Sequence, residues 1–136
     1  MKGLFDASAL VNLAINGGSK AADAIAEGSG ISLTFYEIGN SVWKLHYLLK
    51  KLSHDDTKSL LETSLQLFGR LDILNLTASD AIQVEELASV RKVTFYDSSY
   101  LYAAKKNKLA LVTDDERLTR AAHRETIATF SSASIL

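Results

Sequence analysis

Short, continuous runs of apolar residues alternate along the chain with longer segments in which apolar residues recur at intervals of three and four. The short runs have the length and composition of buried strands. We predict strands over residues 3–6, 72–76, 109–113 and 127–130, of which 109–113 (LALVT) is the clearest. Residues 31–35 (ISLTF) fit either a strand or the entry to a helix.

The longer segments have the period of amphipathic helices. The predicted helices cover residues 7–15, 19–27, 35–51, 53–70, 79–91 and 98–107, with a further one starting near residue 115. In the longest segment, the apolar positions that carry the period are Phe35, Ile38, Val42, Leu45 and Leu49. Ser53 followed by Asp56 indicates the N-terminus of the next helix.

This alternation predicts an α/β fold, a three-layer sandwich in which a short parallel sheet is flanked by helices on both faces. A length of 136 residues suits one domain, and we expect it to cover residues 1–136. In open parallel sheets, ligands bind beyond the carboxyl ends of the strands. The residues that directly follow each strand are therefore the first candidates for a functional site.

Composition narrows the classes of function. The chain is 47% hydrophobic and 23% charged, as ordinary globular domains are. Its net charge is -1, so a nucleic-acid-binding role would depend on local patches. The absence of cysteine excludes disulfides, thiolate metal sites and cysteine nucleophiles. No apolar run approaches the roughly 18 residues of a membrane span, and the N-terminus is a poor signal peptide, so we expect a cytoplasmic protein with no membrane contact.

Acidic residues stand where predicted strands give way to helices. They are Asp6 after the first strand, Glu37 at the start of the long helix, Asp97 after the strand-like VTFY (93–96), and Asp114 and Asp115 after LALVT. These junctions converge in a parallel sheet, and carboxylates brought together repel unless some are protonated. A hard cation such as Mg²⁺, which prefers oxygen ligands, removes that conflict. It also activates water for phosphodiester hydrolysis.

Helix capping is the alternative role for each acid taken alone. Thr34-x-x-Glu37 and Thr113-x-x-Glu116 both match the capping box. Carboxylates near a helix N-terminus are also stabilised by the helix dipole without any metal. No such box surrounds Asp6, so capping does not account for the whole pattern.

Four motifs, in order along the chain, resemble those of the PIN domain. They are F-D-A-S at 5–8, T-x-x-E-x-x-N at 34–40, Y-D-S-S-Y at 96–100 and L-V-T-x-D-x-x-L at 111–118. The resemblance covers essentially the whole chain and is greatest to the toxins of VapBC toxin–antitoxin pairs. It implies a five-stranded parallel sheet, dependence on Mg²⁺ or Mn²⁺, endoribonuclease activity on RNA, a homodimer and an antitoxin partner.

The resemblance also implies roles for single residues. The catalytic and metal-binding acids would be Asp6, Glu37, Asp97 and Asp115. The supporting polar residues would be Ser8, Asn40, Thr113 and Asp114. The sequence leaves open which of the two adjacent aspartates faces the site, although the T-x-D spacing and Leu118 favour Asp115.

Two stripes of side chains on predicted helices add candidate binding surfaces. Arg117, Arg120 and Arg124 share one helix face beside Asp115, where they would bind RNA phosphates or form only a solvated face. A second stripe, on the long helix, consists of Tyr36, Trp43 and Tyr47, which suit either core packing or an interface with a partner.

Other functions are compatible with the same pattern to different degrees. A PIN nuclease of RNA processing or decay and a catalytically silent PIN scaffold both remain open. A phosphorylatable receiver module needs two acids after the first strand, where this chain has only Asp6. The histidines share no zinc-ligand spacing and fit no serine-hydrolase triad, which argues against both chemistries.

Overall fold

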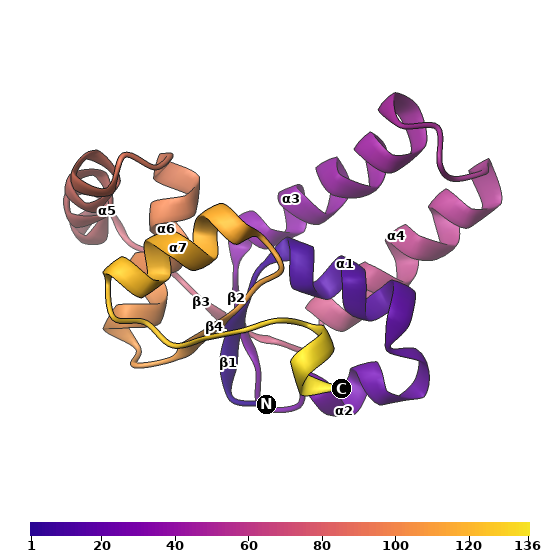
Figure 1. Ribbon diagram of the computed structural model, residues 1–136, viewed down its shortest axis with the longest axis horizontal. Coiled ribbons are helices and arrows are strands. Elements are labelled where there is room, and N and C mark those ends of the chain that lie inside the picture. The colour runs from indigo at the N-terminus through magenta and orange to yellow at the C-terminus, as the bar shows by residue number, and fades with distance from the viewer.

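Five short strands form a single sheet in the order β3-β2-β1-β4-β5, and every pair of neighbours is parallel. The computed structural model describes all 136 residues of the chain (Figure 1). The strands are β1 (Gly3–Phe5), β2 (Ser29–Ile31), β3 (Asp72–Leu74), β4 (Ala110–Val112) and β5 (Thr129–Phe130). In the central strand, Leu4 lies opposite Ser29 on one side and Leu111 on the other.

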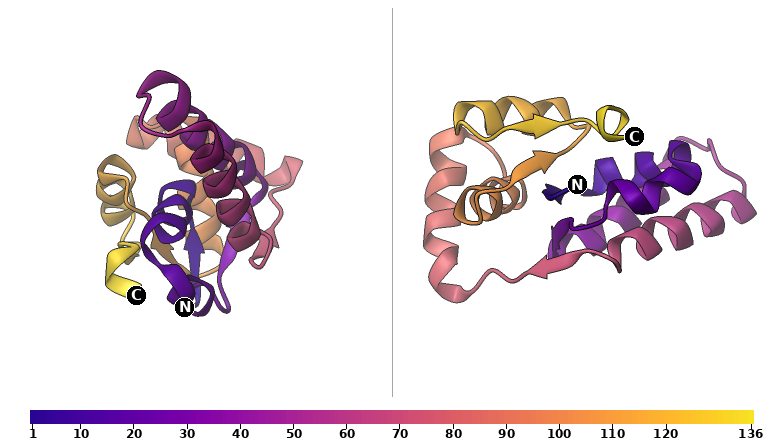
Figure 2. Two further views of the ribbon diagram at one scale, coloured as in Figure 1. Left: turned by 90° about the vertical axis from the view of Figure 1, so that its right-hand side faces the viewer. Right: turned by 90° about the horizontal axis from the view of Figure 1, so that it is seen from below.

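Helices cover both faces of this sheet, as the two views of Figure 2 make clear. One layer contains α1 (Ala7–Asn16), α2 (Ala21–Ala24), α3 (Ser32–Trp43) and α4 (His54–Phe68). The other layer contains α5 (Ala78–Arg91), α6 (Phe95–Lys106) and α7 (Glu116–Arg124). Short turns of other helix types are η1 (Gly18–Lys20), the π-helical η2 (Lys44–Leu48) and η3 (Ala133–Ile135). The predicted three-layer α/β sandwich is confirmed.

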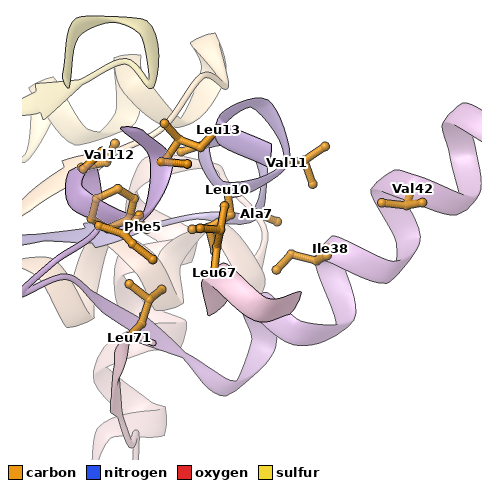
Figure 3. Close-up of a cluster of buried hydrophobic side chains, with 14 residues drawn as sticks. Phe5, Ala7, Leu10, Val11, Leu13, Ile38, Val42, Leu67, Leu71 and Val112 are labelled. Carbon is orange, nitrogen blue, oxygen red and sulfur yellow. The ribbon is translucent and has the colours of Figure 1, made fainter. Parts of the chain in front are cut away.

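The two layers have separate hydrophobic cores because successive strand residues point to opposite faces. Phe5 belongs to the cluster under α1, α3 and α4, which Figure 3 shows together with Leu10, Ile38 and Leu67. Its neighbour Leu4 belongs to the cluster under α6 and α7. A central strand covered on both sides is therefore apolar at each position, as the continuous run in the sequence indicated.

Helices α3 and α4 run side by side and extend beyond the sheet as an antiparallel arm (Figure 1). The N-terminus of α3 lies at the carboxyl end of β2, and its far end continues into η2. At that far end Tyr47, Leu48 and Leu49 are exposed. None of the helices in the structure combines the length and apolar character that a membrane span requires.

The structure corrects the prediction at VTFY (93–96), which is not a strand. The Thr94 side chain caps α6 by accepting a hydrogen bond from the backbone of Asp97, so the chain is already helical at Phe95. Asp97 therefore lies in the first turn of a helix and not at the end of a strand.

Other segments also differ from their predicted bounds, among them the long helix predicted over 35–51, which begins at Ser32 and becomes π-helical at Lys44. The expected helix over 19–27 is reduced to η1 and the four residues of α2. Glu27 has a left-handed backbone, with a φ of 66°, which ends the helical segment there. For residues 31–35 (ISLTF), the sequence allowed a strand or the entry to a helix. The segment contains both, because β2 ends at Ile31 and α3 begins at Ser32.

Candidate active site at the carboxyl edge of the sheet

Asp6 occupies the centre of the carboxyl edge, directly after β1. It is 5% exposed, and its backbone N–H donates to the carbonyl of Val112 on the neighbouring strand, at 3.1 Å. One carboxylate oxygen, Oδ1, accepts from the Ser8 hydroxyl at 2.7 Å and from the Ala9 backbone at 2.9 Å. The other, Oδ2, accepts from the Thr113 hydroxyl. Neutral donors thus hold this carboxylate on both sides.

Thr113, the residue after β4, connects Asp6 to the next loop. Parallel pairing of β1 with β4 brings the two strand ends level, which explains the contact between positions 107 residues apart. The Thr113 hydroxyl also accepts from the backbone of Asp115 at 3.0 Å. Ser8 accepts from the backbone of Asp114 at 2.9 Å. Ser8 and Thr113 therefore fix both the first acid and the loop that carries the last one.

The adjacent aspartates of that loop have different surroundings. Asp114 accepts hydrogen bonds from the Asn12 amide at 2.7 Å and from the backbone and hydroxyl of Ser132, so it ties the C-terminal segment to α1. Asp115 instead lies at the N-terminus of α7, where it caps the helix. Its charge raises the pKa of Glu37 and of Asp97. Of the two aspartates, Asp115 is the one whose charge affects the pKa values of other acids in this region.

Glu37 reaches the same region from the second turn of α3. The Tyr100 hydroxyl, on α6, donates to Glu37 Oε1 at 2.6 Å and lies 2.8 Å from the Thr34 hydroxyl. Tyr100 is only 1% exposed, so the chain buries a whole aromatic ring to bring this donor to the carboxylate. The two helical layers are joined across the sheet edge by this contact.

Asp97 is the acid with the fewest partners. No hydrogen bond to its carboxylate contributes to its pKa, which is affected by burial, by Asp115 and by Arg117. It lines a hollow of about 210 Å³ together with several cationic side chains. Those cations are Lys92, Arg117, Arg120 and Arg124. The predicted arginine stripe thus adjoins Asp97.

The acids disfavour one another's charge. Burial, with a smaller contribution from Glu37, raises the pKa of Asp6 to about 6 despite three hydrogen bonds that lower it. Burial is also the largest cause of the raised pKa of Glu37, followed by the charges of Asp97 and Asp115. The pKa of Asp97 is raised by burial and then by Asp115, against the opposing effect of Arg117. The four acids therefore form one electrostatic group.

The residues of this group fit a divalent cation in their chemistry. All their donor atoms are carboxylate or hydroxyl oxygens, the ligands that Mg²⁺ prefers. A bound cation would favour the charged form of each acid whose pKa is raised. The side chains do not by themselves form a group of three or more ready to coordinate one ion. Magnesium sites commonly use one or two carboxylates and complete the shell with water and substrate phosphate.

The capping alternative is correct for some acids and wrong for others. Asp6 does cap α1, and Asp115 caps α7, so the expectation that capping leaves Asp6 unexplained was wrong. Neither sequence-predicted capping box forms, because the N-cap of α3 is Ile31 and that of α7 is Asp115. Glu37 and Asp97 are not N-caps.

Sequence reasoning missed three polar partners of these acids. Tyr100 stands in the Y-D-S-S-Y motif, three residues after Asp97, so its helical position beside that acid was a usable signal. Asn12 and Lys92 carry no comparable signal. Their contacts with Asp114 and with the hollow beside Asp97 arise only from the tertiary fold.

Comparisons with known proteins identify the family of this chain. Exonuclease VapC9 of Pyrobaculum aerophilum is 33% identical over 88 residues, which cover 65% of this chain and 62% of the length of that relative. The crystal structure of PAE2754 from Pyrobaculum aerophilum superposes with a TM-score of 0.80 and 28% identity, covering 99% of this chain and 93% of the other. The PIN domain profile matches residues 4–124. The family inferred from the four motifs is confirmed, and this chain belongs to the PIN domain family.

Proposed function

We propose that this chain is a nuclease that cleaves RNA internally and depends on Mg²⁺ or Mn²⁺, and that it is the toxin of a type II toxin–antitoxin pair acting in the cytoplasm. The observation that carries the proposal is the electrostatic group of Asp6, Glu37, Asp97 and Asp115, next to the arginines of α7. Membership of the PIN family and a relative that bears a VapC name support it.

In this proposal the four acids would hold the metal. A bound Mg²⁺ supplies an activated water and neutralises charge on the phosphate. The chain's own polar residues prepare the site: Ser8 and Thr113 hold the Asp6 carboxylate, and Tyr100 holds that of Glu37. The arginines beside Asp97 would bind the phosphates of the RNA chain. Hydrolysis joins the water oxygen to phosphorus, breaks one phosphorus–oxygen bond and gives a proton to the leaving oxygen.

A circular single-stranded RNA tests the proposal directly, because it has no ends for an exonuclease. We expect the wild type to open the circle in Mg²⁺ or Mn²⁺ and not in EDTA. Degradation of linear but not circular RNA would mean that the chain is an exonuclease, as the relative is named, and would contradict internal cleavage. If neither RNA is cleaved in Mg²⁺ or Mn²⁺, the nuclease proposal is wrong, and the alternative of a catalytically silent PIN scaffold is favoured.

The toxin proposal also requires a partner surface. On α3 and η2, Tyr36, Trp43 and Tyr47 are all exposed, and the rings of Trp43 and Tyr47 stack 5.6 Å apart. A helix packed on a sheet needs only one apolar face, and here that face contains Ile38 and Val42. The outer part of the aromatic stripe, Trp43 and Tyr47, is therefore free to bind an antitoxin helix or a second copy of this chain.

Trp43→Ala tests that surface. We expect the substitution to weaken antitoxin binding or homodimerisation at least 10-fold, the scale of an aromatic residue central to an interface, and to change the melting temperature only slightly. Sedimentation, affinity for the product of the neighbouring short gene and thermal melts on the same variant measure these effects. A large loss of thermal stability with unchanged association would mean that Trp43 serves the fold and that the interface lies elsewhere.

A further inference from the structure

A second hollow adjoins the acidic group on the α3 side. Its volume is about 460 Å³, within the range of pockets that take small organic ligands. It is lined by Leu33, Tyr36, Glu37, Asn40 and Tyr96. Glu37 belongs both to this hollow and to the electrostatic group, so a ligand in the hollow would lie next to the acids.

The two tyrosines of the hollow contribute little to the hydrophobic core. Tyr36 is 70% exposed and Tyr96 is 60% exposed, although they come from different helices, α3 and α6. Tyr36 and Phe35 form a T-shaped pair with ring centroids 5.2 Å apart. Asn40 is exposed as well, so its amide is available as both donor and acceptor. Two aromatic rings and one amide are thus presented to solvent beside the acids.

We propose that this hollow binds one unstacked base of a single-stranded RNA. The inference rests on the proposed nuclease function and assigns residues of this chain to a site for one base of the substrate. Exposed aromatic rings stack on bases that are splayed out of a strand, and amide side chains bond to base edges. We assign the stacking to Tyr36 and Tyr96 and the edge contact to Asn40.

Charge on the neighbouring hollow favours RNA as the occupant over a protein side chain. The hollow beside Asp97 contributes four cations, which suit a phosphate chain. Tyr96 and Asp97 are consecutive residues in the first turn of α6, so that turn contributes one residue to each of the two hollows. A base and its neighbouring phosphates could then be held on the two sides of the acidic group. Double-stranded RNA keeps its bases stacked and would gain nothing from the tyrosines.

The test measures RNA binding in EDTA, where cleavage is not required. The probes are a fluorescent single-stranded RNA of mixed sequence and the same RNA annealed to its complement, and the readout is anisotropy as a function of salt. We expect Tyr36→Ala and Tyr96→Ala each to weaken single-strand binding about 10-fold or more, because stacking of a base on an aromatic ring is worth about 1–3 kcal/mol. Both phenylalanine variants should bind as the wild type does.

Two controls separate stacking from other effects. Ile82, on α5, is 68% exposed and lines neither hollow, so Ile82→Ala should not change binding. The salt dependence should be unchanged in the tyrosine variants, since they remove no charge. Melting temperatures of the two alanine variants check that they fold.

The outcomes distinguish the base site from the nuclease proposal. Single-strand affinity within twofold of wild type in both alanine variants, or equal losses on single- and double-stranded RNA, would overturn the base site even if the wild type cleaves RNA. Selective loss of single-strand affinity would support it even if no cleavage is found in any metal. If the alanine variants lose only self-association, the tyrosines belong to a protein interface and the inference is wrong.

Discussion

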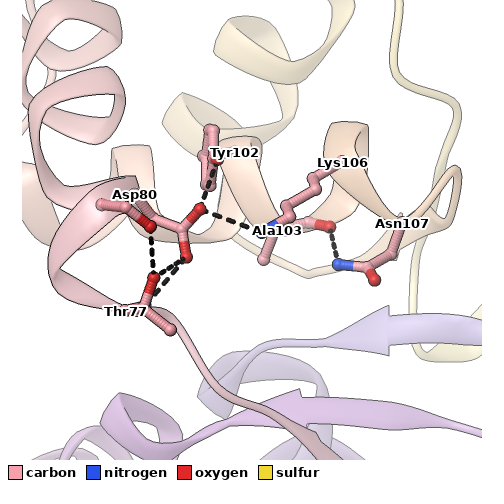
Figure 4. A network of polar contacts seen from close by, with 7 residues as sticks. Thr77, Asp80, Tyr102, Ala103, Lys106 and Asn107 are labelled. Atoms are coloured by element: carbon pink, nitrogen blue, oxygen red, sulfur yellow. Dashed lines mark hydrogen bonds and ion pairs between the residues drawn. The ribbon is translucent and has the colours of Figure 1, made fainter.

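Two buried aspartates in this chain have nearly equal exposure and opposite electrostatics. Asp6, 5% exposed, has neutral hydroxyl and backbone donors around it, and burial raises its pKa to about 6. Asp80, 4% exposed, accepts from the Tyr102 hydroxyl at 2.6 Å and from Lys106 Nζ at 2.9 Å (Figure 4). It also accepts from the backbone and hydroxyl of Thr77, and together these contacts hold its pKa well below the usual range.

The difference lies in the balance between burial and hydrogen bonding. At Asp80, hydrogen bonds from Tyr102, the Thr77 backbone and Lys106 outweigh burial, whereas at Asp6 burial outweighs three hydrogen bonds from neutral donors. Lys106 supplies Asp80 with a cation, so that the carboxylate is compensated within the chain and joins α5 to α6. No lysine or arginine forms a salt bridge with Asp6, Glu37 or Asp97. A carboxylate that is buried and uncompensated costs stability, which is the expected state of a site that receives its cation from solution.

The largest expected effect is the loss of RNA cleavage in the Asp97→Asn variant. The substitution removes a proposed metal ligand without breaking a hydrogen bond of the carboxylate, so RNA cleavage should fall by orders of magnitude. Because it also removes charge repulsion with Asp115, the melting temperature in EDTA should stay equal or rise. Cleavage rates and thermal melts of the same preparation measure both. Full activity in this variant would remove Asp97 from the site.

Asp80→Asn should have the opposite pair of effects: a lower melting temperature and unchanged cleavage. The change leaves Lys106 without its anion and weakens the link between α5 and α6, so the melting temperature should fall by several degrees. Cleavage per folded molecule should stay near that of the wild type, because the Asp80 network adjoins neither hollow of the proposed site. If Asp80→Asn abolishes cleavage at a temperature where it is fully folded, the separation of the two acids into structural and functional groups is wrong.

The pH dependence of stability should separate the two aspartates as well. A carboxyl with a raised pKa binds its proton more tightly in the folded state, so in EDTA Asp6 should make the chain less stable as pH rises from about 4 to about 6. The lowered pKa of Asp80 acts in the opposite sense: its contribution is present above pH ~4 and is lost as pH falls further.

Urea unfolding at a series of pH values between 3 and 8 measures both contributions. Asp6→Asn keeps a side chain able to cap α1 and should flatten the decline between about pH 4 and pH 6. Asp80→Asn should leave that decline intact and instead reduce the loss of stability in acid. Identical pH profiles for the wild type and Asp6→Asn would contradict the raised pKa.

The sequence was sufficient for the two central strands, β1 and β4, because both are continuous apolar runs followed by Asp6 and by Thr113. It left residues 31–35 open between strand and helix, because β2 is the short segment Ser-Gly-Ile, directly followed by α3. It failed at VTFY (93–96), where a capping threonine outweighs the β-branched and aromatic residues around it. Asp6 as the residue after β1 was predictable from local pattern alone. Its raised pKa was not, since that is caused first by burial in the tertiary fold, which is opposed by a hydrogen bond from Thr113, 107 residues away.

The two aspartates illustrate the same limit. Asp80 lies in the box Thr77-x-x-Asp80, and local pattern explains its capping contact. Nothing local indicates that Lys106, 26 residues later, compensates it while Asp6 has no such cation. Whether a buried acid is compensated by a cation is a property of the tertiary fold, and local sequence does not reveal it.

The smallest expected effect is on the stability of a variant at Arg120, one of the cations that line the hollow beside Asp97. Comparing it with a variant at Lys106 tests whether the two cations have different roles. The guanidinium of Arg120 lies 3.9 Å from the carboxylate of Glu116, and both side chains are largely exposed, so this ion pair should contribute little to stability. Arg120→Ala should therefore leave the melting temperature almost unchanged, whereas Lys106→Ala, which removes the cation of a buried acid, should lower it.

The same Arg120→Ala variant should change RNA binding in a characteristic way. If Arg120 contacts a phosphate, the slope of log affinity against log salt should decrease in magnitude by about 0.7–0.9. Lys106→Ala serves as the matched control, since it also removes one positive charge but lies outside the hollow beside Asp97. An equal change of slope in both variants would mean that only net charge matters. An unchanged slope in Arg120→Ala would reduce the stripe to a solvated helix face.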